Sequence, residues 1–470
     1  MNLQPPRRTA RTSLHSRWAL TPPSHPYLHA GGYFLLRYSA FANSFLLGSG
    51  VLCAARTFLL YLAITATDRL TVLILLAKLI YFFLIFKLKY LLCSFLLFTF
   101  AYNDNYNLLN ITPMNTIVSQ FNIQGNVVEV APLGNGLINT TYRVKTEGDA
   151  PDYVLQHVNN AIFPDVDMLM NNIVAVTEHI HGKLVAAGAD DISRKVLKFV
   201  PAKDGKYYHF DGEKYWRVME FIPETESVSA VTPETSYIVG ETFGNFQAML
   251  ADIPAELGET IKDFHNMEFR LRQLREAVAE NKAGRLAEVQ WLVDELEKRA
   301  EEMCKGERMY REGVLPKRIC HCDTKVDNIL FDKEGNVLCV IDLDTVMPNF
   351  IFSDFGDYLR SAANTGKEDD KDLDNVNFNM EIFKSFAKGY LKSAASFITP
   401  VEVENLPYAA ALFPYMQTVR FLADYINGDT YYKIQYPEHN LVRSKAQFNL
   451  LQSVEAHQPE MQAFIAEVMK

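Results

Sequence analysis

The sequence predicts an α+β fold with two lobes, a small antiparallel β-rich lobe followed by a larger, mostly helical lobe. Short apolar runs separated by turn residues occupy residues 127–221, which is typical of strands. After Thr232-Pro233, apolar residues recur at steps of three and four, which is typical of helices. A polar run from His321 to Asn328 then precedes two short apolar segments, which indicates a loop and a hairpin inside the second lobe.

The first lobe is expected to contain strands and one amphipathic helix, over residues 168–187. We expect the strands at 127–130, within 132–144, and at 153–158, 196–200, 207–210 and 215–221. A turn around Gly134-Asn135-Gly136 precedes the second strand. Glycine permits positive φ and a close approach of backbone N–H groups to phosphate oxygens, so this turn is predicted to cover a nucleotide.

The second lobe is predicted to be helical over 234–251, 270–281 and 285–311. The tail from residue 383 to 470 is also expected to be mostly helical. Its helices should be interrupted at four prolines, Pro400, Pro407, Pro414 and Pro437.

The strongest functional pattern is the H-x-D-x-x-x-x-N spacing of His321, Asp323 and Asn328, followed by Asp342 and Asp344 after an apolar strand. An Asp can orient and deprotonate a hydroxyl, while an Asn and a second Asp hold the metal that bridges nucleotide phosphates. The pattern therefore favours a small-molecule kinase that uses ATP and Mg²⁺. The alternative is an acidic surface loop beside an edge hairpin, with His321 in a structural role.

The rest of a nucleotide site can be placed around this pattern. Met219 to Ile222 precede Pro223 and would form the hinge, with Glu220 and Ile222 as nucleotide contacts. A strand running into a linker offers adenine an apolar slot and backbone groups there. Gln156 stands on the third strand, where kinases usually have a Lys or Arg for the phosphates. It donates hydrogen bonds but carries no charge. Glu178 is the candidate inward-facing acid of the amphipathic helix.

Charge divides the chain into two parts. The net charge is −10, yet residues 1–113 are basic and the remainder is strongly acidic. No basic stripe for nucleic acid is evident in the acidic part, so we expect no nucleic-acid partner. The six cysteines lack zinc-finger spacing and are expected to be the reduced thiols of a cytoplasmic protein.

Residues 1–113 form a hydrophobic basic leader that precedes two predicted parts, a nucleotide-binding lobe (114–222) and a catalytic and substrate lobe (223–470). Residues 45–102 contain apolar stretches that could anchor the chain in a membrane as transmembrane helices. Arginines before them favour a cytoplasmic start, and two spans would leave the catalytic part cytoplasmic. Two alternatives remain open: a mis-set start, with the natural protein beginning at Met114, and a disordered, buried or aggregated leader.

With these residues in view, the chain resembles the aminoglycoside phosphotransferase and choline kinase superfamily, and looks most similar to N-acetylhexosamine 1-kinases. The resemblance runs from about residue 127 to 455. It rests on four strings: His321-Cys-Asp-Thr-Lys-Val-Asp-Asn328, Val340-Ile-Asp-Leu-Asp-Thr-Val-Met-Pro348, Asp354-Phe-Gly-Asp-Tyr-Leu-Arg360 and Arg420-Phe-Leu-Ala-Asp-Tyr-Ile-Asn-Gly-Asp429.

The resemblance implies a protein-kinase-like bilobal fold and a role for each matching residue. Asp323 would be the catalytic base, and Asn328 and Asp342 the Mg²⁺ ligands. Asp344 would be a further metal or substrate carboxylate, and Arg420 and Tyr431 would contact a sugar. For Arg420, an ion pair with Asp424 or Asp429 is the structural alternative. For Asp354 and Asp357, the alternative is a charge at a helix N-terminus without a catalytic role.

The implied reaction is ATP-dependent phosphorylation of the anomeric hydroxyl of an N-acetylhexosamine, a step of carbohydrate metabolism. Choline, ethanolamine, homoserine or an aminoglycoside are the alternative substrates. Because Gln156 replaces the usual cation, a nucleotide-binding pseudokinase is a further alternative. A membrane-tethered regulatory module is another, and it requires residues 1–113 to be genuine.

Overall fold

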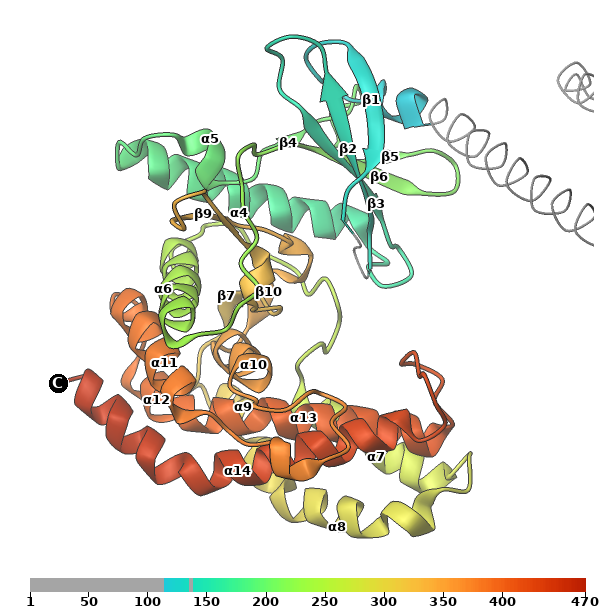
Figure 1. The fold of residues 1–470 in the computed structure, drawn as a ribbon, viewed down its shortest axis with the longest axis vertical. Coiled ribbons are helices and arrows are strands. Elements are labelled where there is room, and N and C mark those ends of the chain that lie inside the picture. The colour runs from blue at the N-terminus through green and yellow to red at the C-terminus, as the bar shows by residue number, and fades with distance from the viewer. Residues whose placement is uncertain (1–113, 135–137) are drawn as a thin grey trace, which may run out of the picture. The chain divides into compact units, whose positions relative to one another are not determined.

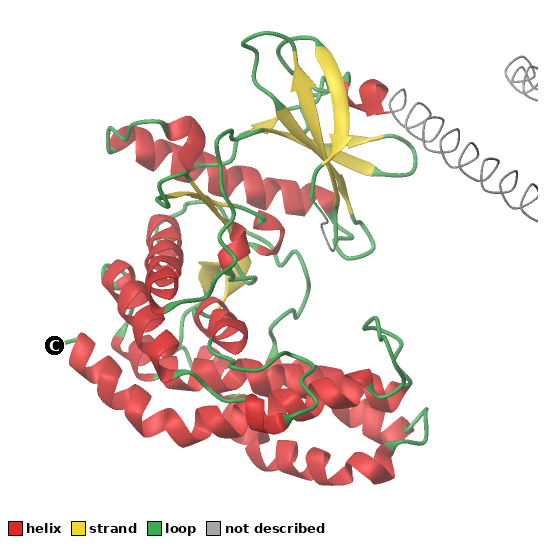
Figure 2. Ribbon diagram, viewed as in Figure 1, coloured by secondary structure: helices red, strands yellow, loops and turns green. Residues whose placement is uncertain are grey.

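An antiparallel sheet forms the first lobe and helices form most of the second (Figures 1 and 2), as the sequence predicts. The computed structural model describes residues 114–134 and 138–470, all within one compact unit. The expectations for residues 1–113, the membrane anchor and the mis-set start included, lie outside the described residues. Within the described part, every helix is too short or too polar to cross a bilayer.

Six short strands build the sheet, in the order β1-β2-β3-β6-β4, with β5 also paired to β6. Every pairing is antiparallel. The strands are β1 (Val127–Pro132), β2 (Thr140–Thr146), β3 (Tyr153–Val158), β4 (Phe199–Val200), β5 (His209–Phe210) and β6 (Tyr215–Glu220).

Alternation along β6 directs its side chains to two different cores. Val218 packs with Val144 and Leu155 on one face, while Met219 packs on the other face with helix α4 (Val166–Ala186). Residues two positions apart share a face, so Arg217 points to the α4 side. The prediction that Glu178 is the inward-facing acid of α4 is wrong, because this side chain is exposed.

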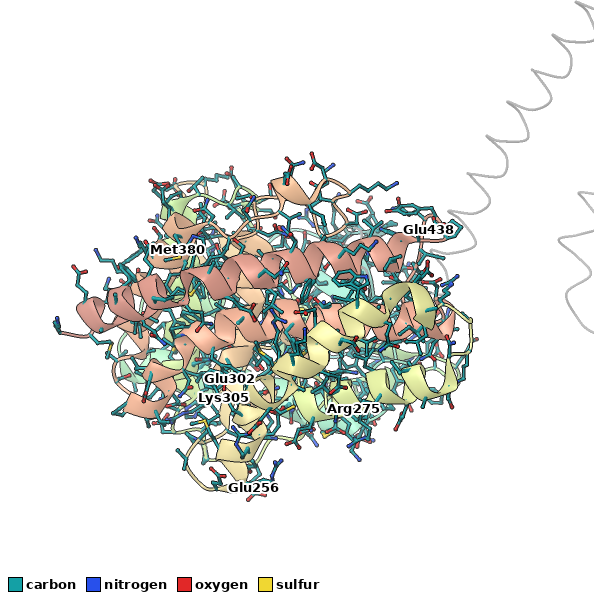
Figure 3. All side chains as sticks on the ribbon, turned by 90° about the horizontal axis from the view of Figure 1, so that it is seen from below. Glu256, Arg275, Glu302, Lys305, Met380 and Glu438 are labelled. Carbon is teal, nitrogen blue, oxygen red and sulfur yellow. The ribbon has the colours of Figure 1, made fainter. Side chains whose placement is uncertain are left out.

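The helical lobe is built around α13 (Leu406–Asn427), whose residues are almost all buried. It packs against α14 (His439–Val468), α10 (Phe352–Ala362) and α7 (Met267–Glu280), and Figure 3 shows α14 running from beside Glu438 along this bundle. Further helices are α5 (Ile192–Lys195) in the first lobe and α6 (Pro233–Leu250), α8 (Leu286–Met303), α9 (Lys305–Arg311), α11 (Met380–Ala394) and α12 (Pro400–Glu404).

Two helix predictions need correction. The helix expected over 285–311 is divided at Cys304, whose ψ of 6° departs from helical geometry, so α8 and α9 are separate. The interruption expected at Pro414 is absent, because α13 continues through it. A proline inside a helix costs about 3 kcal/mol, and burial of nearly all of α13 offsets that cost.

Two small two-stranded sheets carry the loops of the candidate site, and the second of them is a hairpin. Strand β7 (Arg318–Cys320) pairs with β10 (Met347–Asn349), and β8 (Ile329–Phe331) pairs with β9 (Val337–Val340). Two 3₁₀ turns, η1 (Val326–Asn328) and η2 (Leu343–Thr345), follow β7 and β9 respectively. Glu226 of the linker between the lobes pairs with Phe331, which ties the hinge region to this hairpin.

The break at Cys304 places a carboxylate at the start of another helix. Glu307 of α9 accepts a hydrogen bond of 2.6 Å from the backbone N–H of Met267, the first residue of α7. Burial raises the pKa of Glu307 to about 7. The folded protein therefore binds this proton more tightly than the unfolded chain, whose Glu pKa is 4.5. Ionising Glu307 lowers the free energy of unfolding as the pH rises from about 4.5 to about 7.

Replacing Glu307 with Gln should raise the free energy of unfolding by about 1–3 kcal/mol at pH 8 and change it little at pH 5. The amide oxygen still accepts from Met267, while the buried charge is gone. Urea unfolding at the two pH values measures the effect. The exposed neighbour Glu312, changed to Gln, is the matched control. Equal effects of Glu307→Gln at both pH values would contradict the assignment.

Candidate active site

A buried carboxylate holds the backbone of the loop that carries the H-x-D motif. Asp354 of α10 is fully buried and accepts hydrogen bonds from the backbone N–H groups of His321 (2.9 Å) and Cys322 (2.7 Å). Gln247 of α6 donates to the same carboxylate at 2.6 Å. Cys322 has a φ of 62°, so these bonds hold a backbone conformation that non-glycine residues adopt at a cost. Asp354 thus fixes the loop, a role beyond charge placement at a helix start.

His321 links this loop to the second acidic loop. Its ring is buried, and Nε2 lies 2.9 Å from the carbonyl oxygen of Ile341, the residue before Asp342. The edge of the ring meets Phe243, with ring centroids 5.2 Å apart. His321 therefore connects the two loops and does not face open space.

Asp323 is held by two neighbours of the same loop. The side-chain amide of Asn328 donates to Asp323 Oδ2 (3.0 Å) and to its carbonyl oxygen (2.8 Å), and Lys325 Nζ lies 2.8 Å from Oδ2. Burial by itself raises the pKa of the Asp323 carboxyl, but Lys325, His321 and the hydrogen bond from Asn328 together outweigh it and lower the pKa below its usual value. Asp323 is therefore ionised at neutral pH and can accept a hydrogen bond from a hydroxyl.

Asp342 lies close to Asp323, two residues beyond β9 at the open end of the neighbouring hairpin. The backbone N–H of Ile341 donates to the carbonyl oxygen of Asn328 at 2.9 Å, which fixes the two loops side by side. Burial raises the pKa of Asp342, and the charges of Asp344 and Asp323 raise it further. Its φ of 59° is left-handed, which turns the chain sharply into η2. The structure thus brings Asp323, Asn328 and Asp342 together.

The donor set at this point fits a hard cation. Both hydrogen bonds of the Asn328 amide use its nitrogen, which leaves the amide oxygen to act as a ligand beside the Asp342 carboxylate. Among the described residues, no group of three His, Cys, Asp or Glu side chains could hold a metal by itself. Mg²⁺ is usually bound by one or two carboxylates, with phosphates and waters completing the octahedron. Asn328 and Asp342 fit such a site.

Asp344 and Gln156 are already engaged with the protein. Asp344 is buried, and its two carboxylate oxygens meet Arg217 (2.5 Å) and Asn139 (2.6 Å). Gln156 accepts from Arg217 Nε at 3.0 Å and donates to Thr141 Oγ1 at 3.1 Å. In this arrangement, each Asp344 oxygen already accepts one hydrogen bond from the protein, and both ends of the Gln156 amide are bonded to neighbouring strands. The predicted roles of Asp344 and Gln156 in binding stay predictions.

The remaining residues predicted to bind the nucleotide lie in the hinge and in the glycine turn. Gly134 is exposed with a φ of 68°, whereas Asn135 and Gly136 lie outside the described residues. Glu220 pairs with Lys198 at 2.6 Å, and Ile222 is buried in the core that includes α4. Their roles in nucleotide binding stay predictions.

The predicted substrate residues Arg420 and Tyr431 line one cavity of about 150 Å³. Arg270 and Tyr432 line it too, and the guanidinium of Arg420 lies 5.7 Å from the centre of the Tyr432 ring. Tyr431 is 74% exposed. Arg420 Nη1 donates to Gln417 at 3.0 Å.

The alternative of an ion pair for Arg420 is wrong. Asp429 instead pairs with Arg285 at 2.5 Å. Asp424 accepts from the backbone N–H groups of the three residues Thr430, Tyr431 and Tyr432, and so holds the loop that carries the predicted sugar contact.

Two charged residues near the site, Lys325 and Arg217, were not predicted from the sequence, and a third, Asp357, was named without an assigned role. Lys325 lies inside the quoted motif, and its contact with Asp323 could have been suspected from that position alone. Asp357 follows Asp354 by one helical turn; burial raises its pKa to about 6, with the charge of Arg360 opposing the rise and that of Asp323 adding to it. Arg217 carries no motif, and only the strand register reveals it.

The chain is similar to known proteins in a sequence profile and in solved structures. The sequence profile described as "Phosphotransferase enzyme family" matches residues 129–383, more than half of the chain. Three solved structures are similar. An ethanolamine kinase of Plasmodium vivax shows 15% identity and a TM-score of 0.43, with 68% of this chain and 81% of that chain covered. An aminoglycoside phosphotransferase of Alicyclobacillus acidocaldarius shows 14% identity and a TM-score of 0.45, with 75% of this chain and 94% of that chain covered. A choline kinase of Cryptosporidium parvum shows 14% identity and a TM-score of 0.43, with 73% of this chain and 93% of that chain covered.

Proposed function

Because this chain belongs to the phosphotransferase enzyme family, we propose that it transfers the γ-phosphoryl group of ATP to the anomeric hydroxyl of an N-acetylhexosamine. It is a kinase that acts on small molecules. The observation that carries the proposal is the convergence of Asp323, Asn328 and Asp342 at one point between two hydrogen-bonded loops.

In the proposed reaction, Asp323 accepts a hydrogen bond from the sugar hydroxyl and takes its proton as the phosphoryl group arrives. Its lowered pKa keeps it ionised, and the late departure of the proton in a loose transition state requires no strong base. Asn328 and Asp342 would hold Mg²⁺, which when bound offsets negative charge on the phosphate oxygens. Lys325 lies beside Asp323, where its charge would also face the transferred group. Positioning and electrostatics would supply most of the acceleration.

The charges of the helical lobe support a sugar over a cationic alcohol. Arg270 and Arg420 line the cavity together with Tyr431 and Tyr432. Burial lowers the pKa of His265, and the positive charges of Arg420, Arg270 and Arg360 lower it further. Burial also lowers the pKa of Arg270 to about 10, with Arg420 adding to the effect. Such a group repels choline, ethanolamine and polycationic aminoglycosides. Guanidinium and tyrosine groups suit the hydroxyls of a neutral sugar.

A substrate panel tests this proposal. The full chain is incubated with ATP, Mg²⁺ and one acceptor at a time, and ADP release is followed. The acceptors are N-acetylglucosamine, N-acetylgalactosamine, glucose, galactose, homoserine, choline, ethanolamine and kanamycin. We expect an N-acetylhexosamine to give the highest kcat/KM, and phosphorus NMR to place the phosphate on C1. Preference for an amine, or phosphate on another carbon, would refute the sugar assignment. Absence of turnover with every acceptor would favour the pseudokinase alternative.

A further inference from the structure

A buried ion pair joins the two lobes beside the candidate metal site. Arg217 of β6 and Asp344 of η2 have side chains that are 3% and 4% exposed, and they meet at 2.5 Å. Asn139, just before β2, donates to the other carboxylate oxygen of Asp344 at 2.6 Å. Thr260 donates to the Asp344 carbonyl oxygen at 2.8 Å. Asp344 is therefore held on both its side chain and its backbone.

Arg217, the cation of this pair, lies on the strand beside Gln156, which occupies the position where kinases usually have a Lys or Arg. In the antiparallel register, Gln156 of β3 is the partner of Arg217 of β6, and Thr141 of β2 is the partner of Gln156. Side chains at partnered positions share a face, so the three form a row across the sheet. Hydrogen bonds connect the row, from Arg217 Nε to Gln156 (3.0 Å) and from Gln156 to Thr141 (3.1 Å). Gln156 thus orients Arg217 toward the second lobe.

Asp344, the anion of the pair, lies two residues after the candidate metal ligand Asp342. Asp342 has left-handed backbone geometry, which a non-glycine residue keeps only where its surroundings enforce it. On one side, His321 fixes the carbonyl of Ile341 at 2.9 Å. On the other side, Arg217 fixes Asp344. The loop that presents Asp342 is therefore held at both ends, and the second hold comes from the other lobe.

We propose that Arg217 is a positioning residue that sets the Asp342 loop for metal binding, through Asp344, and couples this loop to the nucleotide-binding sheet. It supplies from β6 a cation that joins the lobes, whereas the cation expected on the third strand would contact the phosphates. The inference rests on the proposed nucleotide and metal site, and adds to it a residue that touches neither nucleotide nor metal. Groups hydrogen-bonded to metal ligands usually account for 10–100-fold in metal affinity, and we expect Arg217, which acts through Asp344, to have an effect within this range.

The test measures metal binding without the phosphate acceptor. Mn²⁺ is titrated into the full chain with saturating ADP, and free Mn²⁺ is read by electron paramagnetic resonance. We expect Arg217→Gln to raise the Kd of Mn²⁺ by about 10–100-fold. Arg217→Lys keeps the charge but loses the planar fork, so its Kd should lie between those of the wild type and Arg217→Gln. Asp344→Asn should match Arg217→Gln, and the double variant should add little to either, because both break one interaction.

A second ion pair, more exposed than Arg217–Asp344, distinguishes an effect on stability from an effect on metal binding. Arg299 and Glu455 join α8 to α14 with two hydrogen bonds, far from the metal loop in sequence. Glu455→Gln should lower the melting temperature and leave the Kd of Mn²⁺ unchanged. Should Arg217→Gln not fold, Asp344→Asn carries the test, because an amide can still meet Asn139. Wild-type Mn²⁺ binding in Arg217→Gln or Asp344→Asn overturns the inference. Absence of ADP-dependent Mn²⁺ binding in the wild type overturns the proposed site together with it.

Discussion

Replacing Asp323 with Asn should lower kcat by about 10³-fold, while Mg²⁺ADP still binds with nearly the affinity of the wild type. The amide keeps the size of the side chain but cannot take a proton from the acceptor hydroxyl. Lys325, now without its ion pair, remains beside the site. Turnover is measured by ADP release with the acceptor that the substrate panel identifies, and nucleotide binding by calorimetry.

The same substitution at Asp327 is the control. Asp327 lies four residues further along the same loop and is exposed, so Asp327→Asn should retain wild-type turnover. Turnover near the wild-type level in Asp323→Asn would show that the base is elsewhere. Loss of both turnover and Mg²⁺ADP binding would indicate that Asp323 organises the metal site and that its effect is not limited to proton transfer.

Local patterns in the sequence were sufficient to predict the strands and the catalytic hairpin. The β3 strand, Tyr153–Val158, follows from one apolar run between turn residues, and the β8–β9 hairpin follows from two such runs around a Lys-Glu-Gly-Asn turn. The approach of Asp323 to Asp342 could also be predicted, because the hairpin returns the chain to the loop from which it started.

Contacts between distant segments could not be predicted in this way. Arg217 and Asp344 are separated by 127 residues, and their pairing depends on the register of β6 and on how the lobes meet. Without that register, the sequence indicates only that Gln156 replaces a cation and that Asp344 is a carboxylate without a known partner. Similarly, the continuation of α13 through Pro414 depends on burial by neighbouring helices, which local propensity does not contain.

The second large effect is expected at Asp342. Changing it to Asn should weaken Mn²⁺ binding in the presence of ADP by at least about 100-fold, because a neutral amide replaces the one carboxylate ligand of the proposed ion. Asn tolerates left-handed backbone geometry, so the φ of 59° should persist and folding should be spared. Asp191 has a similar φ of 51° and is exposed, so Asp191→Asn is the matched control. If Asp342→Asn bound Mn²⁺ like the wild type, the ion would have to be held by other groups, and the convergence of Asn328 and Asp342 would have no role in metal binding.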